Sequence, residues 1–269
     1  NLDWRRRFYS GEARIRGGYT HERLFGNIDV DPGPGVDFDN ARYGRAESRG
    51  YILGSGTFDI NQDWRWGFTV EHATDPTLFD RYDIEEVFQD RGLFRADDRR
   101  LINQIYVERQ TDRSYFSAAI LAFQSLRVIG IDTVTYNAGD ARGLIFENDD
   151  TLPIVGPMID FRWEPESSIL GGRLRLRGSA VALFREDYVG SPVISPTYLP
   201  PPGPTAGLPG VDSGRASFEA DWRRIITTDF GLRIEPFMSS RADFYTVDDL
   251  PTGPTDAVEI SRFNATLGL

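Results

Sequence analysis

Cysteine and lysine are absent from the 269 residues of the chain, and histidine occurs only twice. Without cysteine, the chain has neither a disulfide framework nor a thiolate metal site. The 30 basic residues are consequently all arginine. An arginine side chain is a rigid fork of donors that suits phosphate and carboxylate groups, although a GC-rich genome favours the same composition.

Long hydrophobic runs are missing too. The longest apolar run lies around residues 118–123, in SYFSAAILAFQSL. It is far shorter than the roughly 18 residues that a membrane-spanning helix needs. Any part of this chain that enters a membrane is therefore expected to do so as β-strands.

Positive charge is in deficit, because 41 acidic residues against 30 basic ones give a formal net charge of −11. Such a surface repels a phosphate backbone, so nucleic acid is not expected as a partner. Apolar residues make up 40% of the chain, which excludes a wholly disordered protein. The length suits one large all-β domain or two ordinary domains.

The segment at residues 64–72, WRWGFTVEH, alternates between two kinds of side chain. Every second residue is large and apolar, and the residues between are polar or small. This period of two predicts a β-strand with one apolar face and one polar face. The apolar face of this strand comprises Trp64, Trp66, Phe68 and Val70.

The same alternation recurs at 152–164, 171–186 and 214–225. In the last two segments, the apolar face is expected to carry Leu174, Leu176, Phe184, Phe218 and Trp222. The polar face is expected to carry Arg173, Arg175, Arg177, Glu219, Asp221 and Arg223. In the first segment, the apolar set is expected to be Val155, Ile159, Phe161 and Trp163.

Alternation and turn signals together predict eleven strands. Their expected bounds are 1–9, 11–22, 49–60, 64–73, 99–110, 114–127, 152–164, 171–186, 214–225, 230–246 and 258–269. Connections within successive pairs are short, as in NQD at 61–63 and ITTD at 226–229. Connections between pairs are long, namely 23–48, 74–98, 128–151, 187–213 and 247–257.

This alternation of short and long connections is typical of an up-and-down barrel in an outer membrane, with tight periplasmic turns and long external loops. The strands, at about 10–14 residues, are also longer than those of most globular proteins. The apolar face is then expected to contact lipid, and the polar face to line a water-filled lumen. The predicted fold is all-β, an antiparallel up-and-down transmembrane β-barrel to which this chain contributes about eleven strands.

The strand register is expected to be strongly specified. An arginine on the lipid side costs ~2–4 kcal/mol near the bilayer midplane. Slipping the 173–177 segment by one residue would move three arginines there, at a cost on the order of 6–12 kcal/mol.

Candidate catalytic and metal-binding groups are scarce. His21 and His72 are both expected on the apolar face near strand ends, and no nucleophile with an activating base can be built around them. The acidic stretch at 29–40, DVDPGPGVDFDN, lacks the pattern of a calcium loop. We therefore predict no catalytic residue, metal or cofactor, and no enzymatic activity.

An ordered set of motifs runs through most of the chain. It consists of WRWGF, the segment RYD at 81–83, the hairpin YVER…RSYFSA, and the strands LPIVGPMIDFRW and LGGRLRLRGSAVAL. As a set, these motifs resemble the LPS-assembly outer-membrane protein family LptD, also called the organic solvent tolerance protein family. The resemblance is particularly to its alphaproteobacterial branch.

This resemblance implies a very large barrel in the outer membrane of a Gram-negative bacterium. Such a barrel receives lipopolysaccharide from a periplasmic, LptA-like bridge, inserts it into the outer leaflet, and works with an LptE-like lipoprotein plug. Residues 1–269 are then expected to be an internal part of a single barrel domain. The family's N-terminal periplasmic jelly-roll, its lateral-gate strands and its disulfide cysteines are expected outside these residues.

The polar face offers candidate contacts to lipid A phosphates or core sugars through charge-assisted hydrogen bonds. The candidates are Arg173, Arg175, Arg177, Arg223 and Arg233, with Arg14 and Arg16 on like-facing positions and Glu219 and Asp221 beside them. Alternatively, the arginines pair with acidic residues of neighbouring strands and only stabilise the wall. The candidate partners are Glu219, Asp221, Glu235 and Asp243.

Three other classes of protein are alternatives. A generic porin or receptor barrel would show the same strand pattern. An outer-membrane enzyme would need the nucleophile and base that the sequence lacks. A soluble β-sandwich binding module would bury the apolar faces beneath a second layer of polypeptide.

Overall fold

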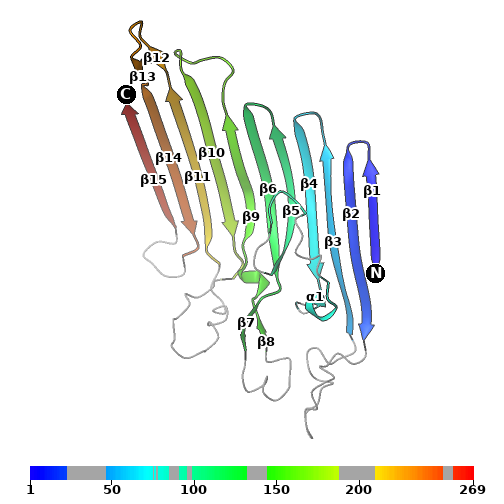
Figure 1. The fold of residues 1–269 in the computed structure, drawn as a ribbon. Coiled ribbons are helices and arrows are strands. Elements are labelled where there is room, and N and C mark those ends of the chain that lie inside the picture. The colour runs from blue at the N-terminus through cyan, green and yellow to red at the C-terminus, as the bar shows by residue number, and fades with distance from the viewer. Residues whose placement is uncertain are drawn as a thin grey trace.

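In the computed structural model, eleven long strands form one antiparallel sheet (Figure 1). The structure describes residues 1–22, 47–74, 76, 78–84, 91–95, 99–131, 144–187, 210–250 and 257–269. The strands of the sheet are β1 (Leu2–Phe8), β2 (Gly11–Glu22), β3 (Glu47–Asp59), β4 (Trp64–Ala73), β5 (Arg100–Gln110), β6 (Ser114–Ser125), β9 (Ile154–Trp163), β10 (Arg173–Phe184), β11 (Asp212–Arg223), β14 (Phe237–Asp248) and β15 (Val258–Gly268). The predicted all-β, antiparallel fold is confirmed.

The order of strands in the sheet follows the order in the chain. β1 and β15 form the two edges and lie at opposite sides of the sheet (Figure 1). Within the described residues no pairing joins these two strands, so the sheet is open. The up-and-down connectivity expected from the alternation pattern is confirmed.

Tight turns gather at one end of the strands, where β1 meets β2, β3 meets β4 and β5 meets β6 (Figure 1). In the turn after β3, the Asn61 side-chain oxygen accepts hydrogen bonds from the backbone N–H groups of Asp63 and Trp64, at 2.9 and 3.0 Å. In the turn after β5, the Thr111 N–H donates to the Ser114 carbonyl at 2.8 Å. These short polar turns fix adjacent strands in antiparallel register.

The connection after β11 differs from the prediction. We expected a four-residue turn at 226–229, but the chain forms a small separate hairpin of β12 (Ile226–Thr227) and β13 (Arg233–Ile234). Gly231 turns this hairpin with a φ of 87°, which favours glycine. Pro236 has no N–H group to donate to the neighbouring strand, so β14 begins only at Phe237. The Pro236 carbonyl still accepts a hydrogen bond from the Arg224 N–H at 3.0 Å.

A second small hairpin, β7 (Val128–Ile131) with β8 (Leu144–Phe146), lies in the predicted 128–151 connection. The helical elements within the described residues are α1 (Leu78–Arg81) and the 3₁₀ turn η4 (Asp149–Thr151). No described helix has the length and apolar character that crossing a membrane requires. The acidic stretch at 29–40 lies outside the described residues.

The face that carries Trp66, Phe184 and Phe218, which we call the outer face, is apolar. The register pairs Leu174 with Trp222, and Gly178 with Phe218, on this face. All predicted lipid-facing residues lie on it: Trp64, Trp66, Phe68, Val70, Leu174, Leu176, Phe184, Phe218 and Trp222.

Each of the eleven strands exposes at least one large apolar side chain on the outer face. These residues are Leu2, Trp4, Phe8, Tyr19, Ile52, Trp66, Val70, Ile105, Ile120, Ile154, Trp163, Phe184, Phe218, Met238, Phe244, Phe263 and Leu267. An apolar surface spread over a whole sheet exceeds the patches that soluble monomers leave open. The second layer that a β-sandwich needs is not among the described residues.

Val155 was predicted on the apolar outer face, and this is wrong. The β9–β10 register shifts between Val181 and Leu183, so that Val181 faces Met158 but Leu183 faces Val155. A bulge adds one residue to one strand and moves the following side chains to the opposite face. Val155 is therefore buried on the inner face, in one apolar cluster with Leu121 and Tyr106.

The opposite, inner face is not polar throughout. Towards the end away from the tight turns, the sheet carries two apolar clusters that the alternation did not predict. One contains Leu53, Ala73, Leu78, Phe79, Leu101 and Leu126, and the other Ile102, Tyr106, Ala119, Leu121 and Val155. Segment 91–94 and helix α1 fold onto this part of the sheet, because Leu93, Phe94, Leu78 and Phe79 belong to the clusters or pack against them.

Candidate functional site

The inner face of β9, β10, β11, β14 and β15 carries rows of charged side chains, as the alternation predicted. Its arginines are Arg162, Arg173, Arg175, Arg177, Arg215, Arg223, Arg241 and Arg262. Its carboxylates, including the one that directly follows β9, are Asp160, Glu164, Glu219, Asp221 and Asp243. Eight positive and five negative charges leave a formal excess of +3 on this surface, although the whole chain carries −11.

At the tight-turn end, Glu164 holds two of the predicted arginines. One carboxylate oxygen accepts from Arg173 Nε, and the other accepts from Arg175 Nε at 3.3 Å. The hydrogen bond from Arg173 is the main cause that lowers the pKa of Glu164 below its usual range. The carboxylate therefore stays charged at any pH near neutrality and keeps both guanidinium groups in place.

Two neighbouring hollows open beside Glu164. The larger, of about 800 Å³, is lined among others by Arg113, Arg173, Arg175, Arg223 and Arg224. The other, of about 620 Å³, is lined among others by Tyr115, Arg162, Arg175 and Arg177. Each offers several guanidinium donors around a space large enough for phosphate or sugar groups.

Further along β10, Arg177 lies 3.7 Å from Glu219 of β11. Arg175 and Asp221 are also opposite each other in the β10–β11 register. The alternative in which the arginines pair with acidic residues of neighbouring strands is thus realised for part of the row.

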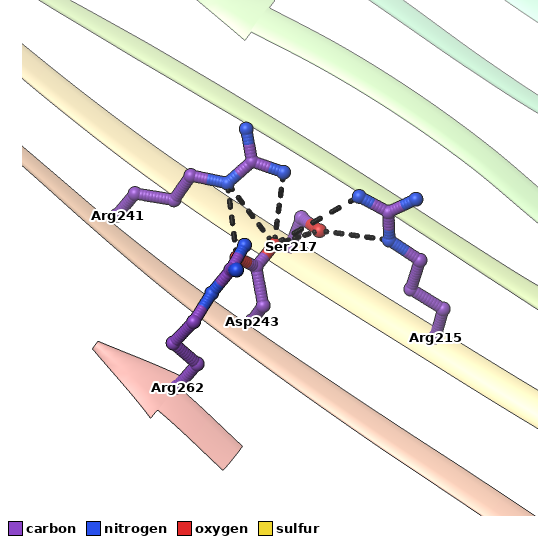
Figure 2. Close-up of polar contacts among 5 residues, drawn as sticks. All are labelled: Arg215, Ser217, Arg241, Asp243 and Arg262. Carbon is purple, nitrogen blue, oxygen red and sulfur yellow. Dashed lines mark hydrogen bonds and ion pairs between the residues drawn. The ribbon is translucent and has the colours of Figure 1, made fainter. Parts of the chain in front are cut away.

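The most highly connected carboxylate of the inner face is Asp243 of β14, whose side chain is completely shielded from solvent. It accepts hydrogen bonds from Arg241 Nε at 3.1 Å, Arg262 Nη2 at 3.0 Å and the Ser217 hydroxyl at 2.6 Å. Arg215 Nη2 lies 3.9 Å away, and Arg215 Nε donates to Ser217 at 3.3 Å. Figure 2 shows the three guanidinium groups around this one carboxylate, each from a different strand.

The remaining predicted arginines lie elsewhere. Arg14, on β2 near the other edge, forms a two-pronged ion pair with Asp3 at 3.2 and 2.8 Å. Arg16 shares the inner face with Arg14. Arg233 was expected on the same strand as Asp243, but it lies in the β12–β13 hairpin, outside the main sheet, 3.5 Å from Glu235.

The sequence analysis missed three arginines of the Asp243 cluster, Arg215, Arg241 and Arg262, and also Glu164. The signal was available for two of them. Arg215 has the same parity as Glu219 on β11, and Arg241 has the same parity as Asp243 on β14. Extending the alternation along both strands would have assigned them to the polar face.

His21 Nδ1 lies 3.2 Å from the Ser48 hydroxyl on the outer face. Across the described part of the chain, no group of three or more histidine, aspartate or glutamate side chains could hold a metal ion. The chemistry that this surface supports is recognition of anions by arginine.

A family model described as "LptD: LPS transport system D" matches residues 47–266, which span β3 to β15. No curated protein matches the chain.

Proposed function

The chain belongs to the LptD family, outer-membrane β-barrel proteins of Gram-negative bacteria that act in lipopolysaccharide transport, and from this premise we propose that its sheet is a sector of the barrel wall of a lipopolysaccharide translocon. In this proposal the outer face contacts membrane lipid and the inner face borders the route to the outer leaflet. The family match over residues 47–266 carries the proposal.

The division of the sheet into two faces supports this assignment. Large apolar side chains are exposed on every strand of the outer face, which lipid tails would cover. The charged inner face suits a water-filled lumen, because unpaired charges are tolerated there and not in a packed core. Among the described strands, β1 and β15 each have one unpaired edge, so further strand pairing would be required to close a barrel.

The wider assembly is part of the same proposal. Lipopolysaccharide is the cargo of this family, and we propose that the complete protein receives it from an LptA-like bridge through a periplasmic domain and works with an LptE-like lipoprotein. The motifs quoted above favour the alphaproteobacterial branch.

Depletion of the full-length protein from its native cell tests the proposed function. Lipopolysaccharide is expected to accumulate in the inner membrane, because its route to the outer leaflet is lost. Re-expression of the complete protein should restore surface lipopolysaccharide. Normal surface lipopolysaccharide after depletion would instead indicate a porin or receptor.

We further propose that the arginine row on β10 contacts lipopolysaccharide. A photo-crosslinking residue at position 175 or 177 is expected to form adducts with lipopolysaccharide in living cells, because both positions point to the inner face, beside the hollow of about 620 Å³. The same residue at Leu176, which faces the outer side between them, is the matched control. Adducts no more abundant than at position 176 would leave these arginines a purely structural role.

A further inference from the structure

We infer that the Asp243 cluster, formed by Arg215, Arg241, Arg262 and the Asp243 carboxylate that gathers them, is a binding site for a phosphate group. The inference rests on the proposed function, in which the inner face borders the route of a phosphorylated glycolipid. It adds a site on β11, β14 and β15 that is separate from the arginine row of β10.

The charge balance of the Asp243 cluster is the first observation. Three guanidinium groups surround one carboxylate, which leaves a formal charge of +2. Glu219 lies opposite Arg241 in the β11–β14 register, and it also lies 3.7 Å from Arg177. Arg177 and Glu219 together are neutral, so they do not change this excess. Like charges at this distance repel one another. If the cluster only joined strands, one arginine for each carboxylate would be more stable than three.

The second observation is that some guanidinium N–H donors of the Asp243 cluster are not used by Asp243 or Ser217. Asp243 occupies Nε and Nη2 of Arg241 and Nη2 of Arg262, and Ser217 occupies Nε of Arg215. In Figure 2, Arg215 and Arg241 each keep a terminal nitrogen that no dashed line reaches. The three side chains are 47%, 39% and 59% exposed on the open inner face, whereas Asp243 is shielded beneath them.

The rigidity of the arrangement is the third observation. Asp243 is held by Ser217 from the neighbouring strand, and Arg215 is placed over the ring of Tyr245, with 5.4 Å between its guanidinium carbon and the ring centroid. The guanidinium groups are thus ordered before any ligand arrives, which lowers the entropy cost of binding. Asp243 acts here as a positioning residue that does not itself contact the anion.

The shape next to the Asp243 cluster suits a small anion. A hollow of about 200 Å³ next to the cluster is lined by three arginines, two carboxylates and two serines, namely Arg162, Arg177, Arg241, Asp160, Glu219, Ser179 and Ser217. The three arginines outnumber the two carboxylates, so the lining keeps a formal positive charge. Arginine recognises the oxygens of a phosphate group through paired, charge-assisted hydrogen bonds. The ligand is therefore a phosphate group, carried by the glycolipid or present as a free ion.

Binding assays on the full-length protein in detergent micelles or lipid nanodiscs test the site. The probes are purified lipopolysaccharide, the same lipopolysaccharide after enzymatic removal of its phosphates, and inorganic phosphate. R215Q, R241Q and R262Q are each expected to weaken binding of phosphorylated lipopolysaccharide by about tenfold. R7Q is the matched control, because Arg7 of β1 also lies on the inner face, 3.5 Å from Glu12, and is not among the proposed lipopolysaccharide contacts.

Removal of the phosphates should reduce wild-type binding to the level of the variants, and added salt should weaken the wild type more than the variants. A merely structural role of the arginines would produce neither difference. Loss of inorganic phosphate binding in the variants, with lipopolysaccharide binding unchanged, would support the site and assign it to a free ion.

Equal affinities of wild type and all three variants for every probe would overturn the inference. Arg215 is the least closely bound of the three arginines, because its Nη2 lies 3.9 Å from the Asp243 carboxylate. R215Q therefore keeps the test valid if R241Q fails to fold. Wild-type protein that binds both forms of lipopolysaccharide equally and binds no inorganic phosphate would contradict only this site. Failure of the depletion experiment would contradict the proposed function itself.

Discussion

Ala180→Arg is expected to lower the free energy of unfolding in a bilayer by about 2–4 kcal/mol, the cost of a lipid-facing arginine near the membrane midplane. Ala180 lies near the middle of β10 on the outer face, paired with Ile159 of β9 and Ala216 of β11. An arginine there has no acidic partner on the adjacent strands and must enter the hydrocarbon or distort the bilayer.

The neighbouring substitution Ser179→Arg is the matched control. Ser179 is exposed on the inner face, opposite Asp160 of β9 and Ser217 of β11, so an arginine there remains in water beside a carboxylate. Its expected effect is within about 0.5 kcal/mol. Denaturant titration of both variants in lipid vesicles, followed by tryptophan fluorescence, measures the difference; equal penalties would mean that the outer face does not contact lipid.

The second large effect is expected for Glu71→Ala, which should cost about 3–5 kcal/mol because it breaks a buried ion pair. The Glu71 side chain on β4 is 3% exposed, and its carboxylate accepts from Arg91 Nη1 at 2.8 Å. Its other oxygen accepts from the Ile102 N–H at 2.9 Å. The substitution removes the carboxylate partner of a nearly buried guanidinium and the acceptor of a buried backbone donor.

Glu71 also determines where segment 91–94 lies. Arg91 is bound to Glu71 and to Thr69, whose hydroxyl donates to the Arg91 carbonyl at 2.7 Å, and the Phe94 backbone is bound to Gln104. Trypsin should therefore cleave after Arg91 much faster in E71A than in the wild type. Glu12→Ala is the control, since its ion pair with Arg7 is exposed and worth less than about 1 kcal/mol; an E71A variant as stable and protease-resistant as E12A would refute this role.

The eleven long strands and the direction of most of their side chains could be predicted from the alternation of residues alone. The period of two in segments such as 64–72 and 173–184 matches the strands observed, and the predicted outer-face aromatic residues all lie there. This was predictable because side-chain direction in a strand depends only on the parity of the position. Strands that follow one another along the chain are also adjacent in this sheet, so the strand order could be predicted from the order in the chain.

The ion pairs between strands, and the part of the inner face that other segments cover, could be found only from the folded structure. Asp243 meets Arg215 and Arg262 because the registers of two strand pairs align them, and those registers depend on turns and bulges that alternation does not encode. The bulge that turns Val155 inwards and the folding of segment 91–94 onto Glu71 have the same origin. Parity along one strand is a local property, whereas contacts between strands depend on how separate segments of the chain are offset from one another.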